Sequence, residues 1–219
     1  ASERPTPGGG SAAAVAAARA RLAPGGRTGT TEVDGASLFI HVVRPHAFDV
    51  VLFGNGHVGR ALVQVLGALP CRVRWIDERE HDFPATVPDN VEIVATDAPA
   101  AEVADAPRGA YVVVMTHSHD LDFDIVEAAL ERHDWAYLGL IGSKPKRAQF
   151  ERRLAARGAP ETGLARVTCP IGAHSGLSSK EPGAIAVGVA AEMLGVRERL
   201  RAASESSTVR ALPRRQERT

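Results

Sequence analysis

The chain has 219 residues, 44% of them hydrophobic, which suits one complete α/β domain with an appendage and is short for two full domains. Its 26 basic residues balance its 26 acidic residues, so no long-range electrostatic field favours nucleic acid or an anionic membrane as a partner. No apolar run approaches the roughly 20 residues that a membrane-spanning helix needs. The two cysteines, Cys71 and Cys169, are too few for a disulfide framework and suit a reducing compartment. We therefore expect a cytoplasmic protein.

Residues 1–47 form a short N-terminal segment that differs in character from the rest of the chain. After a Gly/Pro-rich start, the sequence predicts an alanine-rich helix from about Ser11 to Leu22, a turn at residues 24–26, and a β-like run from Ser37 to Val43. This segment has too little apolar material for a core of its own, so we expect it to pack on the main domain or to be partly disordered. Because the chain begins with Ala1 rather than Met, it is expected to be processed or to be a fragment.

Residues 48–199 alternate between short β-rich runs and helical patterns. The predicted strands are Val50–Phe53, Arg72–Ile76, Val91–Val94, Tyr111–Met115, Tyr137–Ile141 and Arg166–Cys169. The predicted helices are Val58–Leu69, Leu121–His133, Lys146–Arg157 and Pro182–Arg199. Strands this apolar are buried on both faces, which predicts a Rossmann-type doubly wound parallel sheet with helices on both faces. Its ligand cleft must then lie beyond the carboxyl ends of the strands. Residues 200–219 are mainly Arg, Ser and Glu, and are expected to form a solvated, disordered tail.

A glycine-rich turn follows the first of these strands. The letters GNGHVG at residues 54–59 are a G-x-G-x-x-G sequence between a strand and an amphipathic helix. In such a turn, Gly54 allows the sharp bend, Gly56 lets backbone approach a diphosphate, and Gly59 lets the helix pack on the strand. The free N–H groups of the helix favour an anion. Asp77 ends the second strand, 18 residues past Gly59, where it would accept hydrogen bonds from a ribose or similar diol. This combination predicts a site for a phosphate-bearing ligand.

A second group of polar residues, THSHDLDFD at residues 116–124, follows the fourth predicted strand. The spacing comes near the H-x-H-x-D-H pattern of metallo-hydrolases but departs from it, because Leu121 stands where that pattern has aspartate and Asp122 where it has its third histidine. Asp120 is expected to cap the following helix. His117 and His119 at the mouth of the cleft are left with three interpretations: ligand contact, a metal site, or a purely structural role. Ligand contact is favoured.

Three further segments follow later strands. Ser143 and Lys144 come between a strand end and a basic helix, where they would either hold a phosphate or simply begin a solvated helix. Cys169 lies at another strand end on the ligand side, although a lone thiol more often packs as a small apolar residue. Lys180 comes just before the last helix. Cys71, at the opposite end of the sheet, is expected to serve packing.

Six segments in order carry a resemblance to a known family: FGNGHVGRAL, WIDERE, THSHDLDFDIVEAAL, YLGLIGSKPKRAQF, TCPIG and KEPGAIAVGVAAEML. Over about Val51 to Leu194 the chain resembles the XdhC/CoxI family, accessory factors for xanthine dehydrogenase and related molybdenum hydroxylases. The resemblance implies a chaperone, not an enzyme, that binds molybdenum cofactor (molybdopterin), protects it during sulfuration and delivers it to the apo-hydroxylase. It implies a homodimer, with a cofactor-sulfurating enzyme as a further partner. Carried onto this chain, the cofactor-binding candidates are Gly54, Gly56, His57, Gly59, Asp77, His117, His119, Ser143, Lys144, Cys169 and Lys180. Among them, the thiol of Cys169 would suit a soft contact with the metal.

The chain departs from the family in one respect, because residues 1–47 are shorter than the N-terminal domain that family members carry, and lack the cysteine pair expected within it. Two alternatives to the chaperone stay open. An NAD-dependent oxidoreductase would use the same glycine turn and Asp77, although no proton donor with a substrate domain is evident. The second alternative is a nucleotide-sensing regulatory module, for which the sequence contains no recognisable effector segment.

Overall fold

The computed structural model describes residues 11–22, 28–40, 47–176 and 179–210, and the chain divides into two units, Ala1–Pro45 and His46–Thr219. The first unit contains helix α1 (Ala12–Leu22) and an antiparallel hairpin of β1 (Gly29–Val33) and β2 (Ala36–Ile40). The sequence pattern predicted α1 and part of β2 but not β1. A signal for the hairpin was present, because Asp34-Gly35 with both residues at positive φ makes a tight hairpin turn. The predicted turn at 24–26 lies outside the described residues.

The second unit is built on one six-stranded sheet in which every neighbouring pair is parallel. Its strands are β3 (Phe48–Phe53), β4 (Cys71–Asp77), β5 (Val91–Ala95), β6 (Tyr111–Val114), β7 (Tyr137–Leu140) and β8 (Val167–Thr168). The spatial order β5-β4-β3-β6-β7-β8 reverses direction between β3 and β6. The order is that of a Rossmann fold, which confirms the predicted fold class, and ligands of such folds bind at this reversal.

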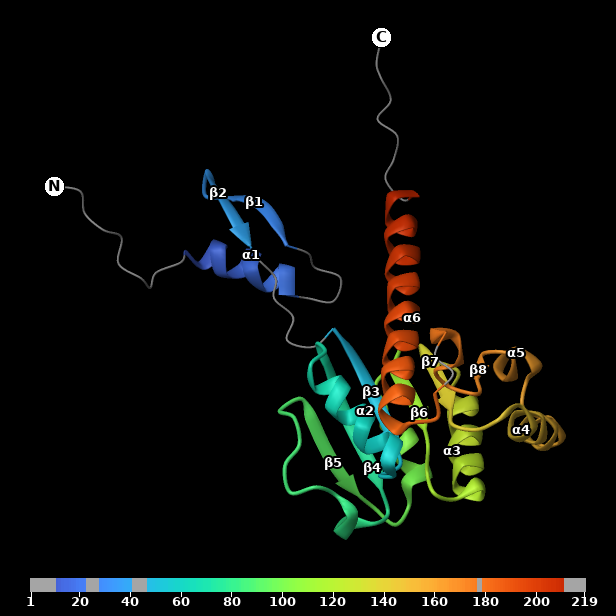
Figure 1. The fold of residues 1–219 in the computed structure, drawn as a ribbon. Helices are drawn as coiled ribbons and strands as arrows, with labels where there is room; N and C mark the ends of the chain where they lie inside the picture. Colours follow the sequence, from blue (N-terminus) through green and yellow to red (C-terminus); the bar gives the residue numbers. More distant parts are fainter. Residues whose placement is uncertain (1–10, 23–27, 41–46, 177–178, 211–219) are drawn as a thin grey trace. The chain divides into compact units, whose positions relative to one another are not determined.

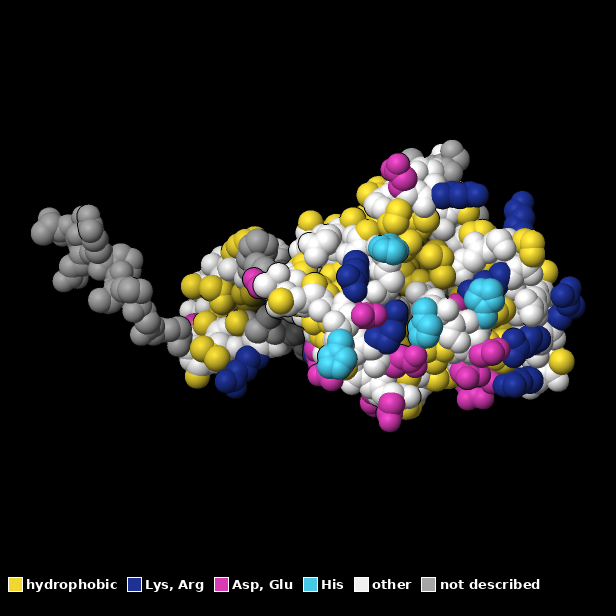
Figure 2. Space-filling model, turned by 60° about the horizontal axis from the view of Figure 1, so that its bottom comes forward, with side chains coloured by type: hydrophobic (Ala, Val, Ile, Leu, Met, Phe, Trp, Pro, Cys, Tyr) yellow, Lys and Arg dark blue, Asp and Glu magenta, His cyan; other side chains and the backbone are white. Residues whose placement is uncertain are grey.

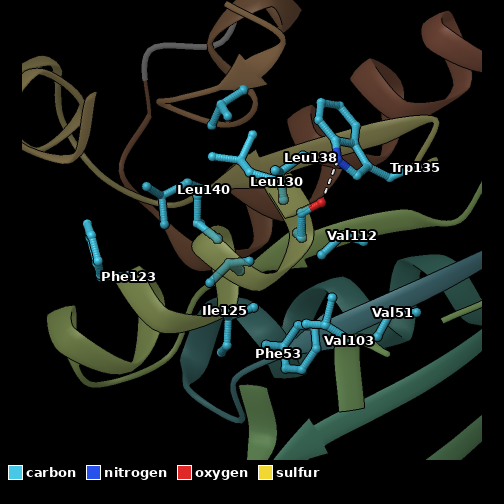
Figure 3. Close-up of a cluster of buried hydrophobic side chains, with 14 of the residues drawn as sticks. Val51, Phe53, Val103, Val112, Phe123, Ile125, Leu130, Trp135, Leu138 and Leu140 are labelled. Atoms are coloured by element: carbon cyan, nitrogen blue, oxygen red, sulfur yellow. Dashed lines mark hydrogen bonds between the residues drawn. The ribbon is translucent and has the colours of Figure 1, made fainter. Parts of the chain in front are cut away.

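Helices cover both faces of the sheet (Figure 1). They are α2 (His57–Gly67), α3 (His119–Arg132), α4 (Lys144–Ala156), α5 (Glu161–Leu164) and α6 (Pro182–Arg210), with short 3-10 turns η1 (Glu80–Asp82), η2 (Pro99–Val103) and η3 (Ala173–Ser175). Because strand side chains alternate between faces, Leu52 packs in the core under α2 and α6, whereas Val51 and Phe53 pack in the core under α3 and α4. Figure 3 shows the second core, which includes Phe123, Leu140 and Trp135.

Two predicted boundaries were wrong. Helix α6 continues to Arg210, although the helix was predicted to end at Arg199 and a disordered tail to begin at residue 200. Residues 200–210 contain neither glycine nor proline, and extending an existing helix needs no new nucleation, so the helix continues even though Leu200 to Glu205 are exposed. The last strand is two residues long rather than four, because Pro170 cannot donate to the ladder and restricts Cys169 before it. Within the part of the chain that the structure describes, no helix is long and apolar enough to cross a membrane.

Candidate functional site

The three glycines of the turn between β3 and α2 meet different surroundings. A Cβ at Gly54, whose φ is +115°, would lie 2.2 Å from the carbonyl oxygen of Met115, and a Cβ at Gly59 would lie 2.2 Å from the carbonyl oxygen of Gly54. These two glycines are therefore required by close packing at the point where β3, β6 and α2 meet. A Cβ at Gly56 would meet no heavy atom within 4 Å, so this residue borders open space. Of the three, only Gly56 leaves room for a ligand.

Helix α2 begins without a side-chain cap. Gly56 is its N-cap and offers no side chain, and no side chain of the described residues caps the first N–H groups of the helix. Beside them, the buried amide nitrogen Nδ2 of Asn55 has no hydrogen-bond partner among the described residues, while its Oδ1 accepts from Arg60 Nε at 3.1 Å. The start of α2 thus presents backbone donors that no described side chain caps, at the positive end of the helix dipole, which is an arrangement that favours anions.

Asp77 lies at the end of β4 as predicted, but its carboxylate is already engaged. Arg79 donates to it from Nε at 2.8 Å, from Nη2 at 2.9 Å and from its backbone N–H at 2.9 Å, and Asn55 N–H donates at 2.6 Å. Burial alone would raise the pKa of Asp77, but these hydrogen bonds outweigh burial and hold the pKa below its ordinary value. Asp77 was predicted to accept hydrogen bonds from a ribose or similar diol, and this stays a prediction; in the structure its oxygens accept from Arg79 and Asn55.

A second acid lies at the reversal of strand order. Asp122 in the first turn of α3 is fully buried, and Lys146 of α4 donates to its Oδ2 at 2.6 Å and to the carbonyl oxygen of Ile141 at 3.0 Å. Thr116 donates to Asp122 Oδ1 from its backbone at 2.9 Å and from its hydroxyl at 2.7 Å. These contacts join the loop after β6 to the loop after β7. Asp122 and Lys146 each stand out in the sequence, but nothing there pairs them, since 24 residues separate them.

The histidines lie at the carboxyl end of the sheet but are not gathered into a metal site. His57, His117 and His119 are exposed, and His117 Nε2 lies 3.4 Å from Glu78 Oε1. Figure 2 brings this end of the sheet forward and shows separate histidine side chains among basic and acidic ones. No three His, Cys, Asp or Glu side chains of the described residues come together in a way that could hold a metal ion. Ser118, not Asp120, caps α3, because its hydroxyl accepts from Leu121 N–H at 3.3 Å.

The remaining candidates follow β7 and β8. Ser143 caps α4 and accepts from Lys146 N–H at 3.5 Å, while Lys144 and Lys180 are exposed. Cys169 is buried in the core under α3 and α4, and its sulfur would lie 3.4 Å from a Cβ placed on Gly142. Burial raises the pKa of Cys169, although Lys146 and Arg147 oppose this effect. The thiol is therefore mainly protonated and packed.

Cys71 lies at the other end of the sheet, at the start of β4. It is fully buried in the core under α2 and α6, and burial raises the pKa of its thiol to about 11. Both its place and its surroundings agree with the predicted packing role.

The structure thus brings candidates from five strand ends to one edge of the sheet. Gly54 follows β3, Asp77 ends β4, His117 follows β6, Ser143 follows β7 and Cys169 follows β8. Several contributors to this edge were not among the predicted site residues: Asn55, Arg60, Arg79, Thr116, Asp122 and Lys146. The pairing of Arg79 with Asp77 could have been predicted from the sequence, because Arg79 stands only two residues after this strand-ending acid.

Comparison with known proteins identifies a family for this chain. Residues 50–193 match the XdhC Rossmann domain. The chain is 30% identical over 161 residues to an uncharacterized Escherichia coli K12 protein, YqeB, of which it spans 28% while 72% of this chain is covered. In structure it resembles a Bacillus halodurans protein described as a xanthine dehydrogenase, with a TM-score of 0.56 and 23% identity, over 68% of this chain and 42% of that one. The last likeness supports the fold alone. The family match contains the glycine turn, both engaged acids and the start of α6, and the chain therefore belongs to the XdhC family, whose Rossmann domain it carries.

Proposed function

We propose that this chain is an accessory protein that binds molybdenum cofactor at the carboxyl edge of its sheet and assists the sulfuration and insertion of the cofactor into xanthine dehydrogenase or a related molybdenum hydroxylase. The observation that carries the proposal is the family match over residues 50–193, which includes this whole edge. On this proposal the partners are the apo-hydroxylase and a cofactor-sulfurating enzyme, the chain works as a homodimer, and it turns over no substrate.

The phosphate end of molybdopterin fits the glycine turn. Gly56 borders open space, and the uncapped start of α2 supplies backbone donors to an anion. The residues that would hold the phosphate are therefore the backbone of 56–59, with Asn55 Nδ2 as a further donor that lacks a partner among the described residues. His57, His117 and His119 are exposed at the same edge and would donate or accept hydrogen bonds at the pterin.

The molybdenum end fits less closely. Cys169 is the candidate for a soft contact with the metal, yet its thiol is buried and its raised pKa favours the protonated form. A thiol in this state packs the core and does not coordinate a metal without local rearrangement. When bound, the cofactor would supply the redox-active metal centre of the client enzyme, and the contribution of this chain would be to bind, orient and shelter it.

An NAD-dependent oxidoreductase is the second candidate, because the strand order and the glycine turn are those of dinucleotide-binding domains. The engaged Asp77 weighs against it, since the carboxylate that would accept the ribose hydroxyls is hydrogen-bonded to Arg79 and Asn55. The two candidates differ in the ligand that they require.

Anaerobic calorimetric titration with molybdenum cofactor, and separately with NAD, tests the choice between them. We expect binding of the molybdenum cofactor and its loss in Gly56→Val, because the new side chain would project into the open space beside the turn. Gly195→Ala in α6 is the matched control, since its Cβ would make an ordinary contact with Arg199 and should leave binding unchanged. Binding of NAD alone, together with sustained turnover at 340 nm, would replace the chaperone by the oxidoreductase.

A further inference from the structure

The carboxylate at the end of β4 has no free position for another donor. An ionised carboxylate offers about four lone-pair positions. Asp77 receives four hydrogen bonds, three from Arg79 and one from Asn55 N–H. Its side chain is only 2% exposed. A ribose whose hydroxyls donate to this acid would therefore have to displace a bidentate arginine first.

Arg79 is fixed on its other side as well. Its Nη1 lies 3.1 Å from Asp82 Oδ2 in η1, and Arg60 of α2 donates both to the carbonyl oxygen of Asp82 and to Asn55 Oδ1. The Arg79 side chain is 35% exposed and that of Asp77 only 2%, so the arginine lies on the solvent side of the acid. These contacts connect the glycine turn, the end of β4 and η1 into one hydrogen-bonded corner.

At this corner, Arg79 also offers no unpaired positive charge that could bind a ligand phosphate in place of a ribose. Arg79 is paired with Asp77 and Asp82, and Glu78 adds a further negative charge nearby. An extra phosphate at this corner, such as the 2′-phosphate of NADP, would therefore meet a neutralised arginine among acids. Among the described residues, the donors left for an anion here are the uncapped N–H groups at the start of α2.

We propose that Arg79 occupies the position that a ribose would take beside the glycine turn, so that the chain selects phosphate-bearing ligands that do not depend on a free 2′,3′-diol. The inference rests on the proposed anion site at the glycine turn and narrows its ligand. It favours molybdopterin without an attached nucleotide over the dinucleotide form of the cofactor. It also assigns to Arg79 a role in specificity that neither the glycine pattern nor the strand order supplies.

The first test uses the unmodified protein and three probes: pyrophosphate, ADP and 2′-deoxy-ADP, each titrated by calorimetry. A site that hydrogen-bonds a substrate hydroxyl rejects the analogue lacking that hydroxyl by large factors. We expect ADP and 2′-deoxy-ADP to bind within about twofold of each other, or neither to bind while pyrophosphate does. A tenfold or greater preference for ADP would overturn the inference, because the 2′-hydroxyl would then be recognised.

The second test removes the arginine. Arg79→Ala should raise the affinity for NAD at least tenfold over the unmodified protein, and Asp77→Asn added to it should remove the gain. Arg79→Gln, which keeps a neutral donor beside Asp77, serves if the alanine variant is poorly folded by circular dichroism. Arg72→Ala is the matched control, because Arg72 is an exposed arginine at the start of the same strand, paired with Glu92. An NAD affinity that stays unchanged in both Arg79 variants would contradict the inference.

Pyrophosphate separates this inference from the proposed function. If Gly56→Val leaves pyrophosphate binding intact, the glycine turn is not the anion site and the proposed function loses its structural basis. If pyrophosphate binding depends on Gly56 while the Arg79 variants gain nothing, the anion site stands and the assignment of Arg79 fails.

Discussion

The two buried acids at the carboxyl edge of the sheet are satisfied in contrasting ways. Asp77 is held by an arginine two residues away, at a rim where that arginine is 35% exposed. Asp122 is held by a lysine 24 residues away, and both side chains are sealed, at 0% and 9% exposure. A local pair at the rim can change what the edge binds without changing the fold. A distant, buried pair instead fixes the loops after β6 and β7 relative to each other, so its loss should be felt in stability.

The largest effect is expected from Lys146→Ala. Removing one partner of a buried ion pair leaves an uncompensated charge, which typically costs about 3–5 kcal/mol in the free energy of unfolding. Urea denaturation measures this loss, and Lys144→Ala, two residues earlier and exposed, should change the free energy by less than about 0.5 kcal/mol. A loss below about 1 kcal/mol for Lys146→Ala would mean that Asp122 finds other partners. The pair Asp122–Lys146 would then contribute no more to stability than the pair Asp77–Arg79.

Arg79→Ala should cost less, about 1–3 kcal/mol. Asp77 would keep its hydrogen bond from Asn55 N–H, and water can reach the place that the partly exposed arginine side chain vacates. The same denaturation series ranks the two variants directly. A loss for Arg79→Ala equal to that for Lys146→Ala would remove the distinction between a specificity pair and a structural pair.

Acid should weaken the Asp77 corner over a defined range. Because the pKa of Asp77 is lower in the folded than in the unfolded chain, its contribution is fully present above the ordinary carboxylate value near 4 and is lost as pH falls toward the folded pKa. The free energy of unfolding of Asp77→Asn should therefore fall less steeply between about pH 4 and 2 than that of the unmodified chain. Parallel curves for the two proteins would show that Arg79 does not stabilise the ionised acid.

The smallest effects are expected at the caps of α3 and α4, the two helices that carry Asp122 and Lys146. Ser118→Ala should cost about 1 kcal/mol, because it leaves a first-turn N–H of α3 without its acceptor. Ser143→Ala should cost less, since its hydrogen bond to Lys146 N–H is longer, at 3.5 Å, and exposed. Thermal unfolding of both variants tests the order. A larger loss for Ser143→Ala would indicate that α4 depends on its cap more than α3 does.

The sequence was sufficient for the parts of this edge that depend on local pattern. The apolar strands, the glycine turn and the acid at the end of β4 each have a spacing that follows from backbone geometry. The partners of the acids were not predictable in the same way. Lys146 meets Asp122 only because β6 and β7 are neighbours in the sheet, and this neighbourhood becomes known only with the fold. Arg79 was close in sequence, but whether it turns toward Asp77 or toward solvent depends on Asp82 in η1.

The two tryptophans of the chain, Trp75 and Trp135, divide between the two cores. Trp75 donates from Nε1 to the carbonyl oxygen of Gly54 at 3.0 Å, so its indole is bonded directly to the glycine turn. Trp135 donates to the carbonyl oxygen of Ala129 in the core on the other face of the sheet (Figure 3). The core on each face of the sheet therefore contains one tryptophan, which is an intrinsic fluorophore. In Trp135→Phe, the emission that remains would come from Trp75 alone, and would report occupancy of the turn without any attached label.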